Sequence, residues 1–275
     1  MSRFGIPFVG FERGYFLDIQ SFFPKKQLFG HKILSSPCNL RCYYCHRRAF
    51  LDGKYPLIST KKVLAELYKL EFFNTIVLTG GEITLYYQAA IDIMKHLQNA
   101  GITTLFSTNG SFQRRVEQML PFADVVKIDI KGHKSQYKHV TGDEKTYDSA
   151  LQSIAIASEK TKVEVKIILH GFTEPRHINQ ILEDVYQYTG MPSNLAVEFQ
   201  PVRDFLKLGI AEPEIVRTLT ICAAAKPLPL ITLLKHYGEK ERIYRLENSR
   251  WKIFCEKEIP LRFNWNSCDG TQATL

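Results

Sequence analysis

Short apolar runs alternate with amphipathic helical patterns over most of this chain, and the alternation restricts the fold more than any other feature. The runs are rich in Val, Ile, Leu and Phe, as strands covered on both faces should be. Six of them are predicted strands: 31–36, 75–79, 103–107, 125–130, 163–169 and 195–200. Helices are predicted at 113–120, 147–159, 176–189 and 212–225. Two more are predicted earlier, one capped by Ser59 and one with an apolar stripe between Tyr86 and Leu97.

Repeated strand–helix units predict right-handed crossovers and a parallel sheet. Six units are too few for a closed eight-unit barrel, so we expect an α/β fold built on a partial, TIM-like (β/α)6 barrel. An open doubly wound sheet is the alternative. We predict an N-terminal segment that packs on the barrel (1–30), a core (31–226) and a C-terminal extension (227–275) with short strands at 231–235 and 243–246.

Three cysteines follow the first predicted strand: Cys38, Cys42 and Cys45. This spacing gathers three soft thiolates, which are the usual ligands of iron–sulfur clusters and zinc. Three thiolates would leave one iron of a [4Fe–4S] cube open to a substrate or cofactor. Structural zinc is the first alternative, but zinc takes four closed ligands, and His46 adjoins Cys45 too closely to complete a tetrahedron. Three buried, unligated thiols are the second alternative.

Formal net charge is +8, from 36 Lys and Arg against 28 Asp and Glu. This balance favours an anionic partner, such as nucleic acid or an anionic small molecule, although the basic residues are scattered and suit a solvated surface equally well. No run approaches the ~18 apolar residues of a membrane span, and the N-terminus lacks the apolar stretch of a signal peptide. Six cysteines in such a chain favour thiolate ligation in a reducing cytoplasm.

Glycine-containing polar motifs follow the next three predicted strands. Residues 79–82 are Thr-Gly-Gly-Glu, residues 107–110 are Ser-Thr-Asn-Gly, and residues 129–132 are Asp-Ile-Lys-Gly. Ligands bind at the carboxyl ends of the strands in parallel α/β sheets. We therefore expect these motifs and the cysteine loop to converge on one rim of the sheet.

The cysteine motif resembles the signature of the radical S-adenosylmethionine (SAM) enzymes, Cys-x3-Cys-x-aromatic-Cys, with Tyr44 at the aromatic position. The resemblance spans roughly residues 31–205 and implies a partial barrel, one [4Fe–4S] cluster and SAM. In that family the open iron chelates the methionine part of SAM, and reduction releases a 5′-deoxyadenosyl radical that takes hydrogen from the substrate. The resemblance also implies an electron donor such as ferredoxin or flavodoxin.

Gly80, Gly81 and Glu82 resemble the second signature of the family, Gly-Gly-Glu-Pro, with Ile83 in place of the proline. The resemblance implies that all three bind SAM, with the glycine backbone close to its methionine. Glu82 would also suit the N-terminus of a helix, where a carboxylate interacts favourably with the dipole.

The third and fourth motifs resemble Asp-Thr-Asn-Gly and Asp-Leu-Lys of activating enzymes for glycyl-radical proteins. The resemblance implies SAM-binding roles for Ser107, Asn109 and Asp129, and for Lys131 both a catalytic role and an ion pair with the SAM carboxylate. A solvated lysine and a turn-capping aspartate are the alternatives. Segments 166–171 and 198–201 match the same pattern in order and spacing.

We predict a radical SAM enzyme, and the resemblance favours one that takes hydrogen from a backbone glycine of a partner protein. The first alternative is modification of a small molecule, nucleoside or tRNA, as by the 7-carboxy-7-deazaguanine synthases. A zinc-bearing nucleic-acid-binding module is the alternative outside enzymes. Cys222, Cys255 and Cys268 are too widely spaced for an auxiliary cluster, and we expect free buried cysteines there.

Overall fold

The structure is a computed structural model that describes residues 4–16, 22–23, 25–45, 47–48, 51, 55–190, 192–202, 231–237, 240–247 and 250–258. The described strands form one eleven-stranded sheet in the order β11-β10-β9-β8-β7-β6-β5-β4-β2-β1-β3. Their bounds are β1 (Gly5–Tyr15), β2 (Phe29–Ser35), β3 (Leu57–Ser59), β4 (Thr75–Gly80), β5 (Thr103–Thr108), β6 (Val125–Ile130), β7 (Lys162–Leu169), β8 (Leu195–Pro201), β9 (Ile231–Tyr237), β10 (Lys240–Glu247) and β11 (Arg250–Glu258). All six predicted strands are confirmed, as are the two short strands predicted near the C-terminus.

The described helices lie between these strands. They are α1 (Thr60–Leu67), α2 (Tyr87–Asn99), α3 (Gln113–Met119), α4 (Tyr137–Thr141), α5 (Thr146–Ser158) and α6 (Pro175–Thr189), with 3-10 turns η3 (Ile83–Tyr86), η4 (Leu120–Phe122) and η5 (Lys134–Gln136). The predicted helix at 212–225 lies outside the described residues. Ser59 caps α1 as expected, with its side chain accepting a hydrogen bond from the Lys62 amide.

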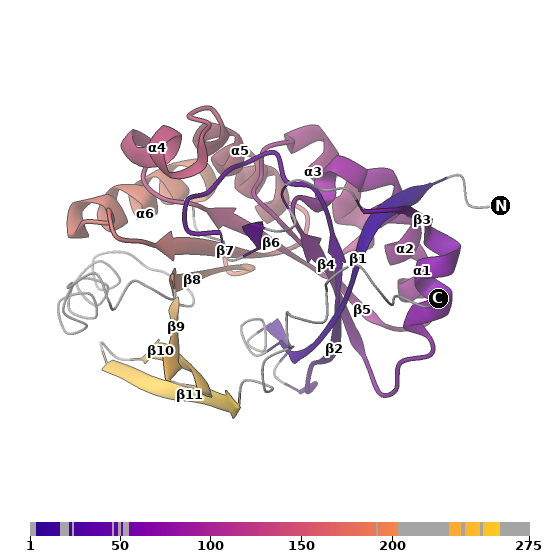
Figure 1. Ribbon diagram of the computed structural model, residues 1–275. Helices are drawn as coiled ribbons and strands as arrows, with labels where there is room; N and C mark the ends of the chain where they lie inside the picture. Colours follow the sequence, from indigo (N-terminus) through magenta and orange to yellow (C-terminus); the bar gives the residue numbers. More distant parts are fainter. Residues whose placement is uncertain are drawn as a thin grey trace.

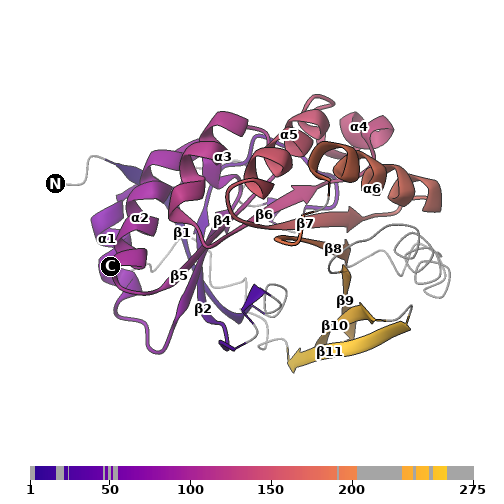
Figure 2. The same cartoon turned by 180° about the vertical axis from the view of Figure 1, so that it is seen from behind.

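Consecutive parallel strands are neighbours in the sheet, from β2 through β4, β5, β6, β7 and β8 to β9. With right-handed crossovers, this order places the intervening helices on one face. Figures 1 and 2 show α1 to α6 along one side of a curved sheet whose other face is concave. A doubly wound sheet would reverse its strand order and carry helices on both faces. The partial (β/α)6 barrel is therefore confirmed, and the doubly wound alternative is wrong.

The first described strand extends the sheet beyond the parallel strands. β1 pairs antiparallel with β2 and, at its start, with β3. The chain after β1 then supplies aromatic side chains to a small apolar cluster on the concave face, made of Phe16, Phe22, Phe23, Leu28, Val77, Leu105 and Val125. The last three members lie in the first half of β4, β5 and β6, so the cluster fills the amino-terminal end of the concave face, away from the carboxyl ends of the strands.

The two faces of the central strands differ in polarity. On β6, Val126, Ile128 and Ile130 pack into the main core beneath the helices, whereas Lys127 and Asp129 alternate with them and face the concave side. The sequence runs suggested apolar cover on both faces, and this expectation is wrong for β6 to β8. Helices cover only one face of a partial barrel, so the other face is free to carry charge. Within the described residues, no helix is long and apolar enough to cross a membrane.

Candidate active site

The cysteine loop begins at the carboxyl end of β2 and rests directly on the end of β4. The Gly81 amide donates to the Ser35 carbonyl at 2.8 Å, and the Glu82 amide donates to the Pro37 carbonyl at 2.9 Å. A Cβ at Gly80 would lie 2.2 Å from the Ser35 carbonyl oxygen, and one at Gly81 would lie 2.3 Å from that of Pro37. Gly80 also has a positive φ of 123°. The two glycines are thus required by the contact between the cysteine loop and β4 itself.

The far side of the cysteine loop is held by α4, a helix that the sequence did not predict. The Arg41 amide donates to the Thr141 carbonyl at 2.8 Å, and the Tyr43 amide donates to the Val140 carbonyl at 3.0 Å. The Arg41 guanidinium folds back on the Cys38 carbonyl at 2.7 Å. The loop is therefore fixed between two parts of the chain about a hundred residues apart (37 and 140).

All three motif cysteines are free thiols in this loop, with Cys42 buried and Cys38 and Cys45 half-buried. Burial raises the pKa of Cys38 to about 11, and the hydrogen bond from the Leu40 amide and, more weakly, the Lys131 ammonium oppose this rise. Burial also raises the pKa of Cys42, again opposed by Lys131. A proton would therefore stay on these sulfurs at neutral pH unless a metal displaced it.

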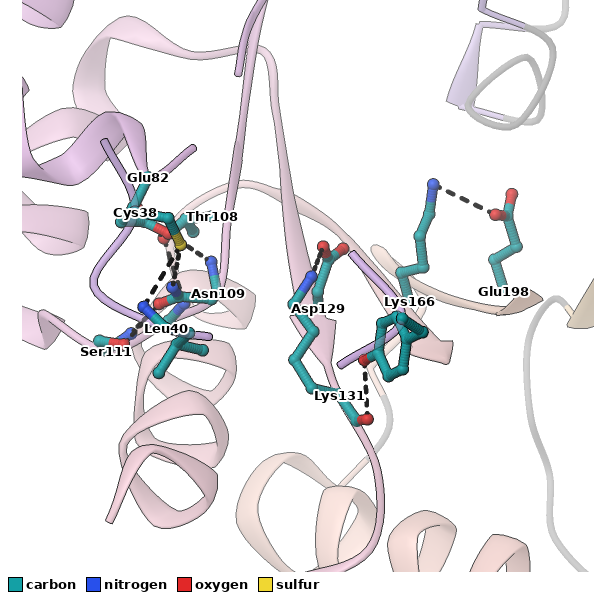
Figure 3. Close-up of polar contacts among 12 residues, drawn as sticks. Cys38, Leu40, Glu82, Thr108, Asn109, Ser111, Asp129, Lys131, Lys166 and Glu198 are labelled. Atoms are coloured by element: carbon teal, nitrogen blue, oxygen red, sulfur yellow. Dashed lines mark hydrogen bonds and ion pairs between the residues drawn. The ribbon is translucent and has the colours of Figure 1, made fainter. Parts of the chain in front are cut away.

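Two N–H groups point at the Cys38 sulfur. The Leu40 amide lies 3.4 Å from it and the Asn109 side-chain amide 3.9 Å, as Figure 3 shows. Such donors stabilise charge on a ligating sulfur and are one of the factors that set the potential of an iron–sulfur cluster. Among the described residues, no three His, Cys, Asp or Glu side chains converge closely enough for one metal ion. Because each thiolate of a [4Fe–4S] cube binds a different iron, a cluster needs the sulfurs farther apart than a single zinc ion does.

Glu82 is fully buried beneath the cysteine loop, and its carboxylate is fully engaged inside the protein. It accepts from the Thr84 amide at 3.0 Å, the Thr84 hydroxyl at 2.5 Å, the Thr108 hydroxyl at 2.7 Å and the Asn109 amide at 2.8 Å. Burial raises the pKa of Glu82, and these hydrogen bonds oppose the rise. The carboxylate caps η3, as its place before a helix suggested, and also joins the ends of β4 and β5.

The side chain of Asn109 connects β5 to the cysteine loop. Its amide nitrogen donates to the Asn39 side-chain oxygen at 2.8 Å, while its oxygen accepts from the Ser111 amide and hydroxyl at 3.0 and 2.5 Å. The Asn39 amide in turn donates to the Ser111 hydroxyl at 2.8 Å. The donors of Asn109 are thus directed at the loop, close to Cys38.

Asp129 and Lys131 lie at the end of β6 and form an ion pair, with 2.5 Å between Lys131 Nζ and Asp129 Oδ2. Burial alone would lower the pKa of Lys131, but Asp129 and the nearby Cys42 raise it overall, so the ammonium stays charged. Two tyrosines fix the backbone here. The Tyr44 hydroxyl donates to the Lys131 carbonyl at 2.9 Å, and the Lys131 amide donates to the Tyr137 hydroxyl at 3.1 Å.

His170, at the end of β7, packs against the tyrosine of the cysteine motif. Its ring stacks on Tyr44 with 5.7 Å between centroids and 18° between planes. Burial lowers the pKa of His170 to about 4, so the imidazole is neutral at neutral pH. A Cβ at Gly132 would lie 2.5 Å from His170 Nε2. Glycine at position 132 therefore allows the imidazole to lie against the turn that follows Lys131.

Charged side chains line the concave face of β6 to β8. Lys127 pairs with Glu164 at 3.2 Å, and Lys166 pairs with Glu198 at 3.2 Å; the second pair is drawn in Figure 3. Strand register sets Asp129 beside Lys166 and Lys166 beside Glu198. Glu164 Oε1 and Asp129 Oδ1 are buried and accept no hydrogen bond within the described residues, whereas Glu164 Oε2 faces the Lys127 ammonium. A ligand that carries N–H or O–H donors would suit this wall.

The structure brings the predicted site residues to one rim, in two groups that Figure 3 shows apart. One group joins the cysteine loop to β4 and β5, and the other joins Tyr44 to the end of β6 and to β7. Ser107 is half-buried on β5, on the same strand face as Leu105 and beside Lys127 in the register. Sequence reasoning missed Thr108, Ser111, Lys127 and Glu164. The available signal for the last two was charge at alternate positions of otherwise apolar strands.

Comparisons with known proteins show the family of this chain. Residues 33–185 match the Radical SAM superfamily. A candidate glycyl-radical enzyme activating enzyme of Methanocaldococcus jannaschii is 30% identical over 103 residues, which are 37% of this chain and 42% of that protein. A candidate GTP 3′,8-cyclase of Saccharolobus islandicus is 26% identical over 170 residues, which are 60% of this chain and 52% of that protein. The chain spans about half the length of these curated relatives.

Two solved structures share the fold. TYW1 with a lysine-pyruvate adduct bound has a TM-score of 0.53 at 15% identity, covering 81% of this chain and 84% of that chain. Streptococcus suis SuiB bound to the precursor peptide SuiA has a TM-score of 0.54 at 12% identity, covering 68% of this chain and 43% of that chain. At these identities the likeness concerns the fold alone.

The superfamily match covers more than half of the chain, so this protein belongs to the Radical SAM superfamily. Enzymes of this superfamily use a [4Fe–4S] cluster and SAM.

Proposed function

We propose that the thiolates of Cys38, Cys42 and Cys45 hold one [4Fe–4S] cluster and that the rim beside them binds SAM. When bound, the two cofactors would supply one-electron cleavage of the SAM sulfonium and a 5′-deoxyadenosyl radical for hydrogen abstraction. One observation supports this most strongly. Three free thiols lie on a loop clamped between β4 and α4, with N–H donors directed at the Cys38 sulfur and with the Lys131 ammonium within electrostatic range of Cys42.

The residues around the cysteines then have distinct tasks. Lys131 offers a cation that an anionic group, such as the SAM carboxylate, would share with Asp129. Asn109 steadies the cysteine loop and directs a donor at Cys38. Glu82 holds the ends of β4 and β5 together, so its part in SAM binding is to shape the turn. The apolar cluster at the amino-terminal end of the concave face excludes water from that side.

For the substrate we propose a backbone glycine of a partner protein, which the cleaved SAM would convert into a glycyl radical. The support is the similarity to the Methanocaldococcus jannaschii protein, whose name assigns it to glycyl-radical enzyme activation. A ferredoxin or flavodoxin would supply the electron.

A second candidate substrate is a polar small molecule or nucleoside. The charged wall of Lys127, Glu164, Lys166 and Glu198 favours it, because alternating cations and carboxylates offer a polar ligand several charged hydrogen-bonding partners, whereas an uncharged glycine backbone would use few of them. The similarity to the Saccharolobus islandicus protein, named for a reaction of GTP, points in the same direction.

Anaerobic reconstitution followed by a dithionite-driven assay for 5′-deoxyadenosine tests the core of the proposal. The intact chain should turn brown, bind iron and sulfide and form 5′-deoxyadenosine. Cys42→Ser should lose both properties, whereas the matched control Cys255→Ser, on β11 outside the motif, should keep them. Equal product from Cys42→Ser and the intact chain would falsify the proposal. A colourless protein with one bound zinc would instead support the nucleic-acid-binding alternative, which also predicts steeply salt-dependent binding.

Electron paramagnetic resonance (EPR) separates the two candidate substrates. If the substrate is a partner glycine, a glycyl-radical doublet should arise only when a candidate partner protein is added. If the substrate is a small molecule, consumption of that molecule should accompany 5′-deoxyadenosine formation and no protein radical should accumulate.

A further inference from the structure

A group of exposed aromatic and cationic residues borders the cysteine loop on the helix side of the sheet. We call it the rim patch and define it by Arg41, Tyr43, Arg48, Lys138, His139 and Phe172. It combines residues of the cysteine loop, of α4 and of the turn after β7. All six side chains are exposed; Phe172 is 46% and Tyr43 36% accessible. The proposed function assigns no role to this surface.

The aromatic rings of the rim patch are held in place by one another. Phe172 contacts Tyr43 edge to face with centroids 5.5 Å apart, and it contacts His139 in the same way at 4.9 Å. Tyr43 also rests on the buried His170 ring at 5.9 Å. Rigid, exposed aromatic side chains of this kind are frequent anchors of protein–protein interfaces, because little side-chain entropy is lost when they are covered.

The charge of the rim patch is mainly positive. Arg41 and Arg48 donate to backbone carbonyls of the cysteine loop, so no carboxylate neutralises them in these contacts. Lys138 faces Glu144 across 4.0 Å, but both side chains are largely exposed and the pair is loose. Asp143 also lies near and is engaged with the Lys145 amide and the Thr146 hydroxyl. Together with the net charge of +8, this surface favours an acidic partner.

The location of the patch restricts what its partner can do. Tyr43 adjoins Cys42 in the chain, and Figure 1 shows α4 in the helix layer, on the opposite side of the sheet from the concave face. A substrate has to reach the concave side, where the charged wall and Lys131 lie. A partner bound to the rim patch would approach the cysteines from the helix side of the sheet and leave the concave side free for the substrate.

We propose that the rim patch is the docking surface for a small acidic electron-transfer protein that reduces the cluster through the cysteine loop. This inference rests on the proposed function, since it requires a cluster on the three cysteines. The donor gives up one electron, the oxidised [4Fe–4S]2+ cluster becomes [4Fe–4S]1+, and no proton or group is transferred. Rim charges govern the association rate more than the affinity, so charge reversal should act on the rate of reduction.

The test compares two reductants on the reconstituted protein. Lys138→Glu combined with Arg48→Glu should slow reduction by a purified acidic flavodoxin or ferredoxin roughly tenfold at low salt, because steered association depends steeply on charge. Phe172→Ser should slow it too, by removing the anchor. Dithionite, a small reagent that needs no docking surface, should reduce all variants at the rate of the unaltered protein.

Two matched controls bear on the result. Lys61→Glu with Lys62→Glu reverses two exposed charges on α1, and Phe72→Ser removes a ring that is 76% accessible far from the cysteines in sequence. Both should leave reduction by the acidic protein unchanged. Equal slowing by the rim and control variants, or no slowing by either, would overturn the docking proposal. Failure of the unaltered protein to cleave SAM with dithionite would overturn the proposed function instead.

Discussion

The two halves of the site are built in opposite ways. Around Cys38, the side chains of Glu82, Thr108 and Asn109 satisfy one another in a closed network with the cysteine loop. On β6 and β7, Asp129 and Glu164 keep buried oxygens that accept no hydrogen bond within the described part of the chain. A closed network fixes a geometry, whereas an incomplete one has capacity left for a ligand. We infer that the first half holds the cysteine loop and the second half contacts what is bound.

The largest effect is expected from Gly81→Ala. Its Cβ would lie 2.3 Å from the Pro37 carbonyl oxygen, and backbone on both sides prevents easy relief. The cysteine loop should therefore shift, and iron incorporation should fall sharply. Iron content after reconstitution measures the effect. Gly101→Ala is the control, since a Cβ at Gly101 meets nothing within 4 Å; its positive φ of 72° adds backbone strain that Gly81→Ala lacks, so the control is a stringent one. Equal iron contents in the two variants would contradict the packing role given to Gly81.

Glu82→Ala is expected to have the next largest effect. It should lower the free energy of unfolding of the cofactor-free protein by about 3 kcal/mol or more. The change leaves the Thr108 hydroxyl and the Asn109 amide buried without an acceptor, and each such group costs about 1–3 kcal/mol. Urea denaturation measures it. A loss below about 1 kcal/mol would mean that the network is not the fixed half of the site.

Replacement of the Lys127–Glu164 ion pair should affect substrate turnover and leave stability largely unchanged. A double change to Lys127→Met and Glu164→Met should leave the free energy of unfolding unchanged or slightly higher, because buried ion pairs are often no better than apolar side chains of similar size. Turnover of the true substrate should fall, while 5′-deoxyadenosine formation without substrate persists. A loss of stability as large as that of Glu82→Ala would erase the contrast between the two halves.

The smallest expected effect is on how the free energy of unfolding depends on pH under acidic conditions. Glu12 on β1 pairs with Lys32 at 2.8 Å and with Arg47 of the cysteine loop at 2.5 Å. Burial would raise the pKa of Glu12, but the two cations lower it to about 2 from its ordinary 4.5. A lowered pKa in the folded state stabilises the protein above pH 4.5, and this stabilisation is lost as the pH falls towards 2.

Glu12→Gln should therefore reduce the dependence of unfolding free energy on pH between about 4.5 and 2, while changing little at pH 7 beyond a modest loss. Urea titrations at several pH values measure this. An unchanged acid slope would show that the ion pairs of Glu12 do not persist in solution.

The sequence predicted the parallel strands because apolar runs bounded by turns are a local signal, and all six runs proved to be strands. The convergence of the four loops on one rim followed from strand direction alone. The role of each side chain at that rim could not be predicted from strand direction. Gly80 and Gly81 were expected to make room for SAM, yet their hydrogens face the backbone of residues 35–38, a contact between distant segments.

The pairing of charged side chains also depends on tertiary contacts, so the sequence alone could not predict it. Lys127 and Glu164 are 37 residues apart and meet only because β6 and β7 pair in one register. The stack of His170 on Tyr44 likewise depends on where the loops after β2 and β7 meet. The expected divisions at residues 30 and 226 and the helix at 212–225 stay predictions.

The EPR spectrum of the reduced, reconstituted protein with and without SAM tests the central claim most directly. If Cys38, Cys42 and Cys45 hold a [4Fe–4S] cluster with one open iron, the reduced protein should give a [4Fe–4S]1+ signal whose g-values shift when SAM is added. Cys42→Ser should lose the signal and Cys255→Ser should keep it. A protein that gives no cluster signal, or a signal that SAM leaves unchanged, would contradict the account.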